Sequence, residues 1–101
     1  MYEIRYLPLA RNDLTDIESY IADHLKAPKA AMDLLNALDE SISRLEHFPS
    51  SCRVYQPIKA LEAEYRLLPV KNYAVFYVVN EQAVEIHRIV YAKMDLTKLI
   101  K

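Results

Sequence analysis

Several residue types are scarce in this 101-residue chain, and each scarcity excludes a class of protein. Glycine is absent altogether, which excludes the glycine-rich loops that cradle phosphates in many nucleotide-binding proteins. The single cysteine, Cys52, has no second cysteine with which to form an internal disulfide. No apolar run approaches the roughly 20 residues that a membrane helix needs. We therefore expect a protein of the reducing cytoplasm that does not bind a membrane.

The length and composition predict one domain that spans residues 1–101. With 52% hydrophobic residues, a chain of this length can bury one continuous core. The first residues carry charges at Glu3 and Arg5 instead of a basic start followed by an apolar stretch, so they do not read as a secretion signal. We expect the folded domain to begin at once.

The charge of the chain is close to neutral, with a formal net charge of −1. Proteins that hold nucleic acid by bulk positive charge neutralise several phosphates, and this chain has no such excess. Acids are concentrated in residues 10–40, and the second half is richer in basic residues and tyrosine. Any contact with nucleic acid must therefore be local.

Two helices are predicted in the first half of the chain. In residues 9–25 apolar side chains recur three and four apart, which is typical of an amphipathic helix. Its acids, Asp13 among them, suit the outer face. Pro28 fits the first turn of a second helix, and the apolar spacing continues over residues 28–45. Together the two segments predict a helical hairpin.

The remaining segments predict a sheet. Residues 2–7 alternate apolar and charged side chains as a strand does. Three later runs also look like strands, and the second of them is rich in β-branched and aromatic residues: residues 63–70, 72–79 and 83–91. Asp95 can cap a short terminal helix. The fold class is therefore α+β, with an N-terminal strand, an α-helical hairpin, a three-stranded antiparallel meander and a short C-terminal helix.

Residues that could carry chemistry lie mainly in the second half. Cleavage of RNA without a metal needs a base, a cation beside the phosphate and an acid for the leaving oxygen. Arg66, His87, Tyr91 and Lys93 supply these types of group. The same residues also have ordinary structural interpretations: Arg66 in a surface salt bridge and His87 as a packed strand histidine. No metal ion or cofactor is expected.

Strand alternation assigns the candidates of the last strand to faces. Alternate residues point to opposite sides of a sheet, so His87 and Arg88 cannot face the same site. The mainly apolar set is expected to face the helices, and the other set, with His87 and Tyr91, to face away from them. The first set is Val84, Ile86, Arg88 and Val90, and the second is Glu85, His87, Ile89 and Tyr91.

Four segments, in this order, resemble toxins of the RelE/ParE superfamily: YEIRYLPLARNDLTDIESYI, SRLEHFP, EYRLLPVKNYAVFYVV and IHRIVYAKMDL. The resemblance implies the toxin of a type II toxin–antitoxin system, with a helical hairpin packed on a twisted antiparallel sheet. It also implies a cognate antitoxin whose C-terminal segment wraps the toxin. We expect an acidic or amphipathic segment of that antitoxin to shield the sheet and the more basic second half.

The superfamily contains two mechanisms, since RelE-like members cut mRNA on the ribosome and ParE-like members poison DNA gyrase. RelE-like nucleases carry arginines at the places that Ala74 and Met94 occupy here. Their loss favours ParE-like gyrase inhibition over a metal-independent endoribonuclease. Arg66, His87 and Tyr91 echo related YoeB-like ribonucleases in type but not in spacing, so RelE-like cleavage remains the alternative. A third reading is an inactive member that only binds antitoxin.

Overall fold

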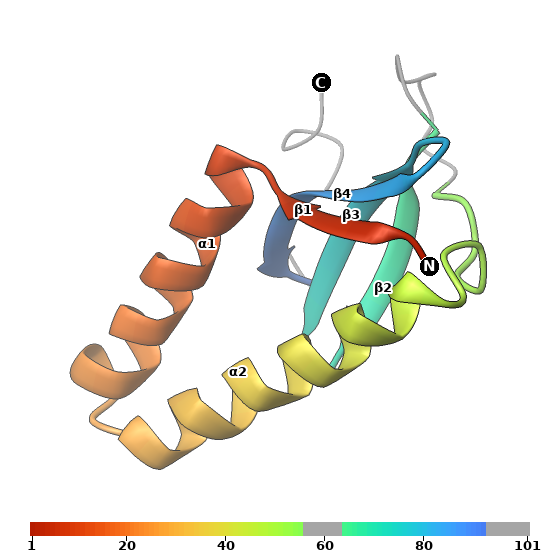
Figure 1. The fold of residues 1–101 in the computed structure, drawn as a ribbon. Coiled ribbons are helices and arrows are strands. Elements are labelled where there is room, and N and C mark those ends of the chain that lie inside the picture. Colours follow the sequence, from red (N-terminus) through yellow and green to blue (C-terminus); the bar gives the residue numbers. More distant parts are fainter. Residues whose placement is uncertain (56–63, 93–101) are drawn as a thin grey trace.

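A computed structural model of the chain describes residues 1–55 and 64–92. In this part, a helical hairpin packs against a four-stranded sheet (Figure 1). The elements, in chain order, are β1 (Glu3–Tyr6), α1 (Pro8–Ser19), the π-helical turn η1 (Tyr20–His24), α2 (Pro28–Ser43), the 3-10 turn η2 (Arg44–Glu46), β2 (Arg66–Val70), β3 (Tyr73–Val79) and β4 (Ala83–Tyr91).

The predicted helical hairpin is confirmed. Each helix starts with a proline, Pro8 or Pro28, at a first-turn position where the missing amide donor costs little. Lys26 reverses the chain between the helices with a positive φ of 53°. The first helix does not stay α-helical to its end, because the Leu25 amide donates to the Tyr20 carbonyl five residues back, the bonding of a π-helix.

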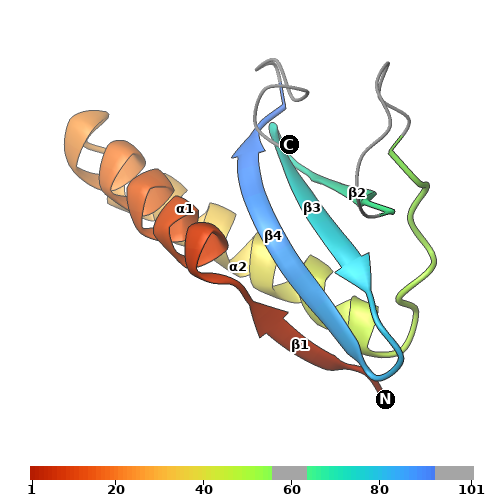
Figure 2. The ribbon, with the colours of Figure 1, turned by 90° about the horizontal axis from the view of Figure 1, so that it is seen from above.

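The sheet has the strand order β1-β4-β3-β2, as Figure 2 shows from above. Strands β2, β3 and β4 pair antiparallel in chain order, but β1 runs parallel to β4, with Glu3 opposite Ala83. The expectation of a wholly antiparallel sheet is therefore wrong for β1. Alternation in a sequence shows which face a strand buries, and it carries no information about the direction of the neighbouring strand.

The predicted strand over residues 63–70 is shorter at its start, since β2 begins at Arg66. Residue 63 and the predicted terminal helix after Asp95 lie outside the described residues. The turn between β3 and β4 closes without glycine, and the Asn80 amide donates to the Ala83 carbonyl across 2.8 Å. Lys71, between β2 and β3, takes a positive φ of 52°. Among the described residues, no helix is long and apolar enough to cross a membrane.

The main core lies between the hairpin and the sheet. Leu34, Leu38 and Ile42 of α2 are buried there, as their helical spacing predicts, against β3 and β4 side chains such as Val75 and Ile86. A smaller buried cluster occupies the opposite face of the sheet. It consists of Ala74, Phe76 and Val90, with Tyr55, Tyr65 and Leu67 packed against them.

A β-bulge in β4 changes which residues face the helices. Phe76 of β3 is opposite Arg88 and Tyr77 is opposite Ile86, so His87 is an extra residue in β4. Beyond it the alternation is reversed: Ile89 belongs to the helix-side core and Val90 to the opposite cluster. The predicted faces are therefore wrong for Ile89, Val90 and Tyr91, because strict alternation assumes an unbroken ladder.

Candidate functional site

Arg66, the leading candidate among the predicted site residues, donates hydrogen bonds to backbone carbonyls of a neighbouring segment. Its guanidinium donates to the carbonyl oxygen of Cys52 at 2.7 Å and to that of Ser50 at 3.4 Å, and it lies 3.6 Å from a carboxylate oxygen of Glu64. The side chain is only 20% exposed. Arg66 is opposite Tyr77 in the sheet, and the Tyr77 hydroxyl donates to the nearby Pro49 carbonyl. Both side chains thus hold residues 49–52 against β2 and β3.

His87 lies on the face of the sheet that points away from the helices. Its ring meets Tyr65 edge-on at 5.1 Å, and Nδ1 lies 3.3 Å from the Tyr65 hydroxyl. Nε2 is buried, has no hydrogen-bond partner and lies 3.5 Å from a carboxylate oxygen of Glu85. Alternation from Val84 and Ile86, which face the helices, predicts this face for His87, and the bulge alters the pattern only beyond it.

Tyr91 lies on the other face. It is opposite Tyr73, and the two rings meet edge-on at 5.7 Å. Tyr73 packs against the helix-side core, so Tyr91 faces the helices while His87 faces away from them. The prediction that these two residues share a face is therefore wrong. Lys93 lies outside the described residues, and Arg66, His87 and Tyr91 are not brought together in one site.

Sequence reasoning missed a contact between Asp13 and Arg88. Asp13 was expected on the outer face of its helix, but its side chain is only 13% exposed. Its carboxylate accepts two hydrogen bonds from the Arg88 guanidinium and a third from the Ile89 amide at 2.9 Å. This contact raises the pKa of Arg88 above its ordinary value, mainly through the hydrogen bonds to Asp13. Position 13 falls beside the apolar stripe of the helix, which is the only hint in the sequence.

An apolar groove of about 900 Å³ opens beside this ion pair. We call it the tyrosine groove, because Tyr20, Tyr73 and Tyr91 line it from three different elements. Tyr20 is 52% exposed, Leu25 55% and Tyr91 38%, which is unusual for large apolar side chains that gather in one place. The other lining residues are Asp13, Asp16, Ile17, Ile21, Ala27, Ala30, Asn72, Arg88, Ile89 and Val90.

The pKa of Tyr73 reflects its place in the groove. Burial raises the pKa of Tyr73, and the neighbouring phenols of Tyr91 and Tyr20 raise it further. The π-helical turn begins at Tyr20 and places that ring on the rim of the groove, stacked on His24 with ring centroids 5.4 Å apart. Because a tyrosine joins an apolar ring to a polar tip, this lining suits contact with another polypeptide.

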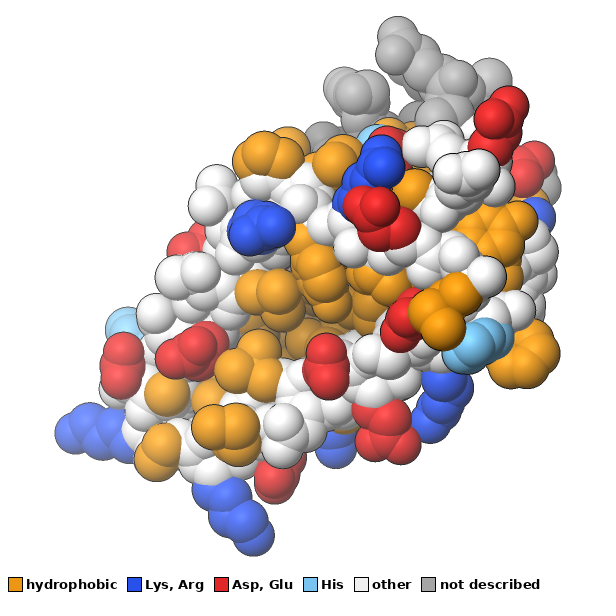
Figure 3. Space-filling model, viewed as in Figure 1, with side chains coloured by type: hydrophobic (Ala, Val, Ile, Leu, Met, Phe, Trp, Pro, Cys, Tyr) orange, Lys and Arg blue, Asp and Glu red, His pale blue; other side chains and the backbone are white. Residues whose placement is uncertain are grey.

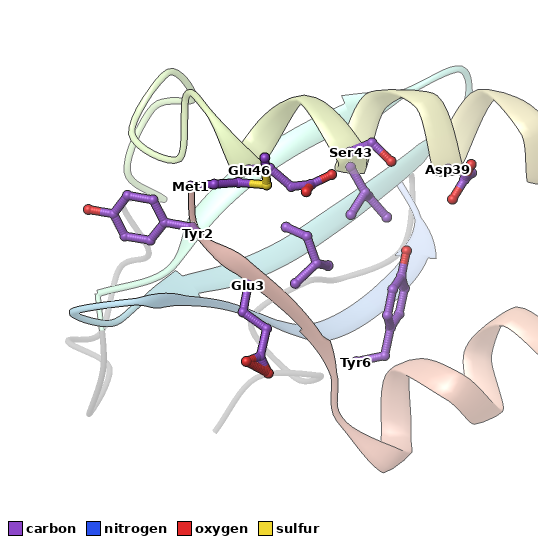
Figure 4. A pocket seen from close by; sticks show the side chains of 9 residues that line it. Met1, Tyr2, Glu3, Tyr6, Asp39, Ser43 and Glu46 are labelled. Carbon is purple, nitrogen blue, oxygen red and sulfur yellow. The ribbon is translucent and has the colours of Figure 1, made fainter.

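A second, smaller cleft of about 520 Å³ lies between β1 and α2. Figure 4 shows the Tyr6 phenol pointing toward α2, with Asp39 and Ser43 on the opposite wall. Glu3, Asp39 and Glu46 line the cleft, and none of its described lining residues is basic. Burial, and secondarily Asp39, raises the pKa of Tyr6. In Figure 3 apolar side chains floor the hollow between α1, α2 and β1, with acidic side chains around it.

The described residues therefore offer surfaces for binding more clearly than a catalytic centre. They contain no group of three or more metal-ligating side chains that could hold a metal ion. His87 and Tyr65, whose side chains are within hydrogen-bonding distance, lie on the opposite face from the tyrosine groove.

Residues 4–96 match the sequence model of a family described as ParE toxin of type II toxin-antitoxin system, parDE. No match is found among curated proteins. Among solved structures, a chain of the "Chromosomal ParDE TA system from P. aeruginosa" is similar, with a TM-score of 0.74 and 18% sequence identity. The match covers 92% of this chain and 98% of that chain. At this identity the likeness shows the fold.

Proposed function

The chain belongs to the ParE toxin family of type II toxin–antitoxin systems, and on that basis we propose that it stops growth by inhibiting DNA gyrase until a cognate antitoxin neutralises it. Inhibition of this kind requires a surface that binds gyrase. It does not require groups that transfer protons to and from a reacting phosphate.

Ala74 is the observation that carries the choice of target. RelE-like nucleases have an arginine at this place, which would stabilise the crowded phosphate of the transition state. Here the Ala74 side chain is 2% exposed and packs with Phe76 and Val90. An apolar cluster therefore occupies the position where a nuclease would need a cation.

The state of Arg66 supports the same choice. Its Nη1 already donates to two backbone carbonyls, and Nη2 lies 3.6 Å from a Glu64 carboxylate oxygen, which would repel a phosphate. A gyrase inhibitor needs no cation beside a reacting phosphate, so Arg66 can stabilise the fold instead.

Neutralisation by an antitoxin is supported by the tyrosine groove. A monomer that exposes several large apolar residues around one apolar groove gains from covering them, and a toxin held in check by a partner needs such a surface. The groove is on the helix side, whereas the sequence predicted shielding of the sheet and the basic second half.

One observation keeps RelE-like mRNA cleavage as the second candidate. His87 and Tyr65 are in hydrogen-bonding contact, with Glu85 close to the second ring nitrogen, and such a set can exchange protons. In that function His87 would act with Tyr65 and Glu85 and without a metal. Of the other catalytic residues that the sequence predicts, Tyr91 lies on the opposite face of the sheet, Arg66 is bound to the backbone of residues 50–52, and Lys93 lies outside the described residues.

Expression of the protein without its antitoxin separates the possibilities. We expect growth to stop and DNA breaks covalently linked to gyrase to accumulate, while translated mRNA stays intact. Cleavage of translated mRNA with unbroken DNA would contradict the proposal and support the second candidate. Unimpaired growth from a folded, abundant protein would contradict both and would identify a member that only binds antitoxin.

A further inference from the structure

The tyrosine groove runs along the first helical segment, and only some of its charged side chains are paired with an opposite charge. Among its described lining residues, Asp13 and Arg88 neutralise each other in a two-pronged ion pair. Asp16, one helical turn after Asp13, has neither a hydrogen bond nor an ion pair through its side chain within the described part of the chain. The groove therefore combines apolar walls with one carboxylate that has no counter-charge.

Most of the edge of β4 is closed to an added strand. A peptide that extends a sheet must bond to free amides and carbonyls along the edge. Here β1 covers β4 as far as Ile86, and Asp13 accepts the hydrogen bond of the Ile89 amide. This favours an occupant that satisfies its own backbone, as a helix does.

The dimensions agree with a helix. The wall from Asp13 to Leu25, formed by α1, η1 and the residue after η1, contains thirteen residues. Their twelve rises span about 18 Å at the usual 1.5 Å per residue. A partner helix lying along it would place about three turns in the groove. Its apolar positions, three and four residues apart, would meet Tyr20, Leu25 and Tyr91.

We propose that an amphipathic helical segment of the antitoxin fills the tyrosine groove and presents a lysine or arginine to Asp16, so that Asp16 determines which antitoxin is accepted. The proposal rests on the antitoxin neutralisation proposed above. Complementary charge selects partners because a like charge placed against Asp16 is strongly unfavourable once the groove is covered. The apolar walls provide the contact area, and Asp16 provides the selectivity.

Selection from a displayed peptide library tests this without knowledge of the antitoxin sequence. The library consists of helical peptides of about 20 residues with apolar residues fixed at helical spacing and all other positions randomised. Purified wild-type protein is expected to enrich lysine or arginine about tenfold at one position beside the apolar stripe. The D16K variant is expected to enrich glutamate or aspartate at that same position.

Glu18 offers a matched control, because it is an exposed acid on the same helix that does not line the groove. Peptides selected on E18K should keep the wild-type preference for a cation. Peptides selected on the wild type should also lose about tenfold or more in affinity for Y20A, which is exposed and lines the groove. Circular dichroism of each variant confirms that it remains folded.

The proposal is overturned if wild-type binders show no preference for a cation, if D16K leaves the preference unchanged, or if binding is insensitive to Y20A. Growth inhibition by the wild-type protein, measured in cells without antitoxin, tests the proposed function independently. A wild-type protein that selects cationic peptides, with the preference reversed by D16K, but never stops growth would refute the toxin activity and leave the groove assignment intact.

Discussion

Arg88 and Asp13 meet through two parallel hydrogen bonds, from Nε to Oδ2 at 2.8 Å and from Nη2 to Oδ1 at 3.0 Å. The same carboxylate accepts a hydrogen bond from the Ile89 amide. Beyond the end of β1, a side chain of α1 therefore supplies the acceptor for the edge of β4. This contact attaches the helical hairpin to the last strand. It also forms part of the wall of the tyrosine groove.

Replacement of Asp13 by alanine is expected to lower the free energy of unfolding by roughly 2–4 kcal/mol. The change leaves a mostly buried guanidinium and a backbone amide without their acceptor. Urea unfolding followed by circular dichroism measures the loss. Glu18→Ala, an exposed acid on the same helix, should change stability by less than about 0.5 kcal/mol. Equal losses in both variants would show that the ion pair contributes nothing specific.

Arg66→Ala is expected to destabilise the fold by about 1–3 kcal/mol, since two backbone carbonyls lose a charged donor. Any loss of growth inhibition should follow the loss of folded protein and should be recovered at lower temperature. A variant that is as stable as the wild type but no longer toxic would show instead that Arg66 contacts the target.

Leu38→Ala should lower the free energy of unfolding by roughly 2–5 kcal/mol, because Leu38 is 1% exposed at the centre of the helix-side core. Met32→Ala is the matched control on the same helix, where the side chain is 57% exposed and little burial is lost. Thermal and urea unfolding should both show a larger loss of stability for Leu38→Ala than for Met32→Ala. A change below about 1 kcal/mol for Leu38→Ala would contradict its place in the core.

Glycine in place of Lys71 is expected to stabilise the protein by about 0.5–1 kcal/mol. A left-handed backbone costs a residue with a Cβ roughly 1–2 kcal/mol, and the extra freedom of glycine in the unfolded chain offsets part of that gain. Lys26→Gly should also stabilise the protein, because Lys26 takes a positive φ in the turn between the two helices. Asn80→Gly, at a turn position without positive φ, should be neutral or destabilising. A loss of stability at both lysine positions would refute this explanation.

Stability is expected to fall as pH rises above about 10. Burial is the largest cause that raises the pKa of Tyr6, Tyr73 and Tyr77 in the folded protein. Above the ordinary value of about 10 the unfolded phenols lose their protons while the folded ones keep them, so the unfolded state gains. Urea unfolding between pH 8 and pH 11 checks the sign. Tyr77→Phe should weaken this pH dependence, because it removes one of the buried phenols whose pKa is raised.

The sequence predicted the two helices and most strand positions because these follow from local periodicity and from Pro8 and Pro28. Two features depend on the partner strand and were missed. The direction of β1 relative to β4 leaves no trace in the alternation of Tyr2, Ile4 and Tyr6. The bulge at His87 is one extra residue against β3, which only the pairing reveals.

The candidate site was harder to predict for the same reason. Arg66, His87 and Tyr91 were chosen for their chemistry, but contacts across the sheet and with residues 49–52 decide where each side chain points. Asp13 illustrates the converse case. A helix wheel places it among solvent-facing acids, and only its contact with Arg88, 75 residues later, buries it.

The parallel pairing of β1 with β4 has a consequence for biosynthesis. Strand β1 is made first but pairs with a strand that begins about 80 residues later, so the sheet cannot close while the chain is still short. At a synthesis rate of roughly 5–20 residues per second, several seconds pass between the two strands. During that interval the nascent chain lacks the strand that contributes Arg88 and Tyr91 to the tyrosine groove. A newly made molecule therefore acquires the complete groove only late in its own translation.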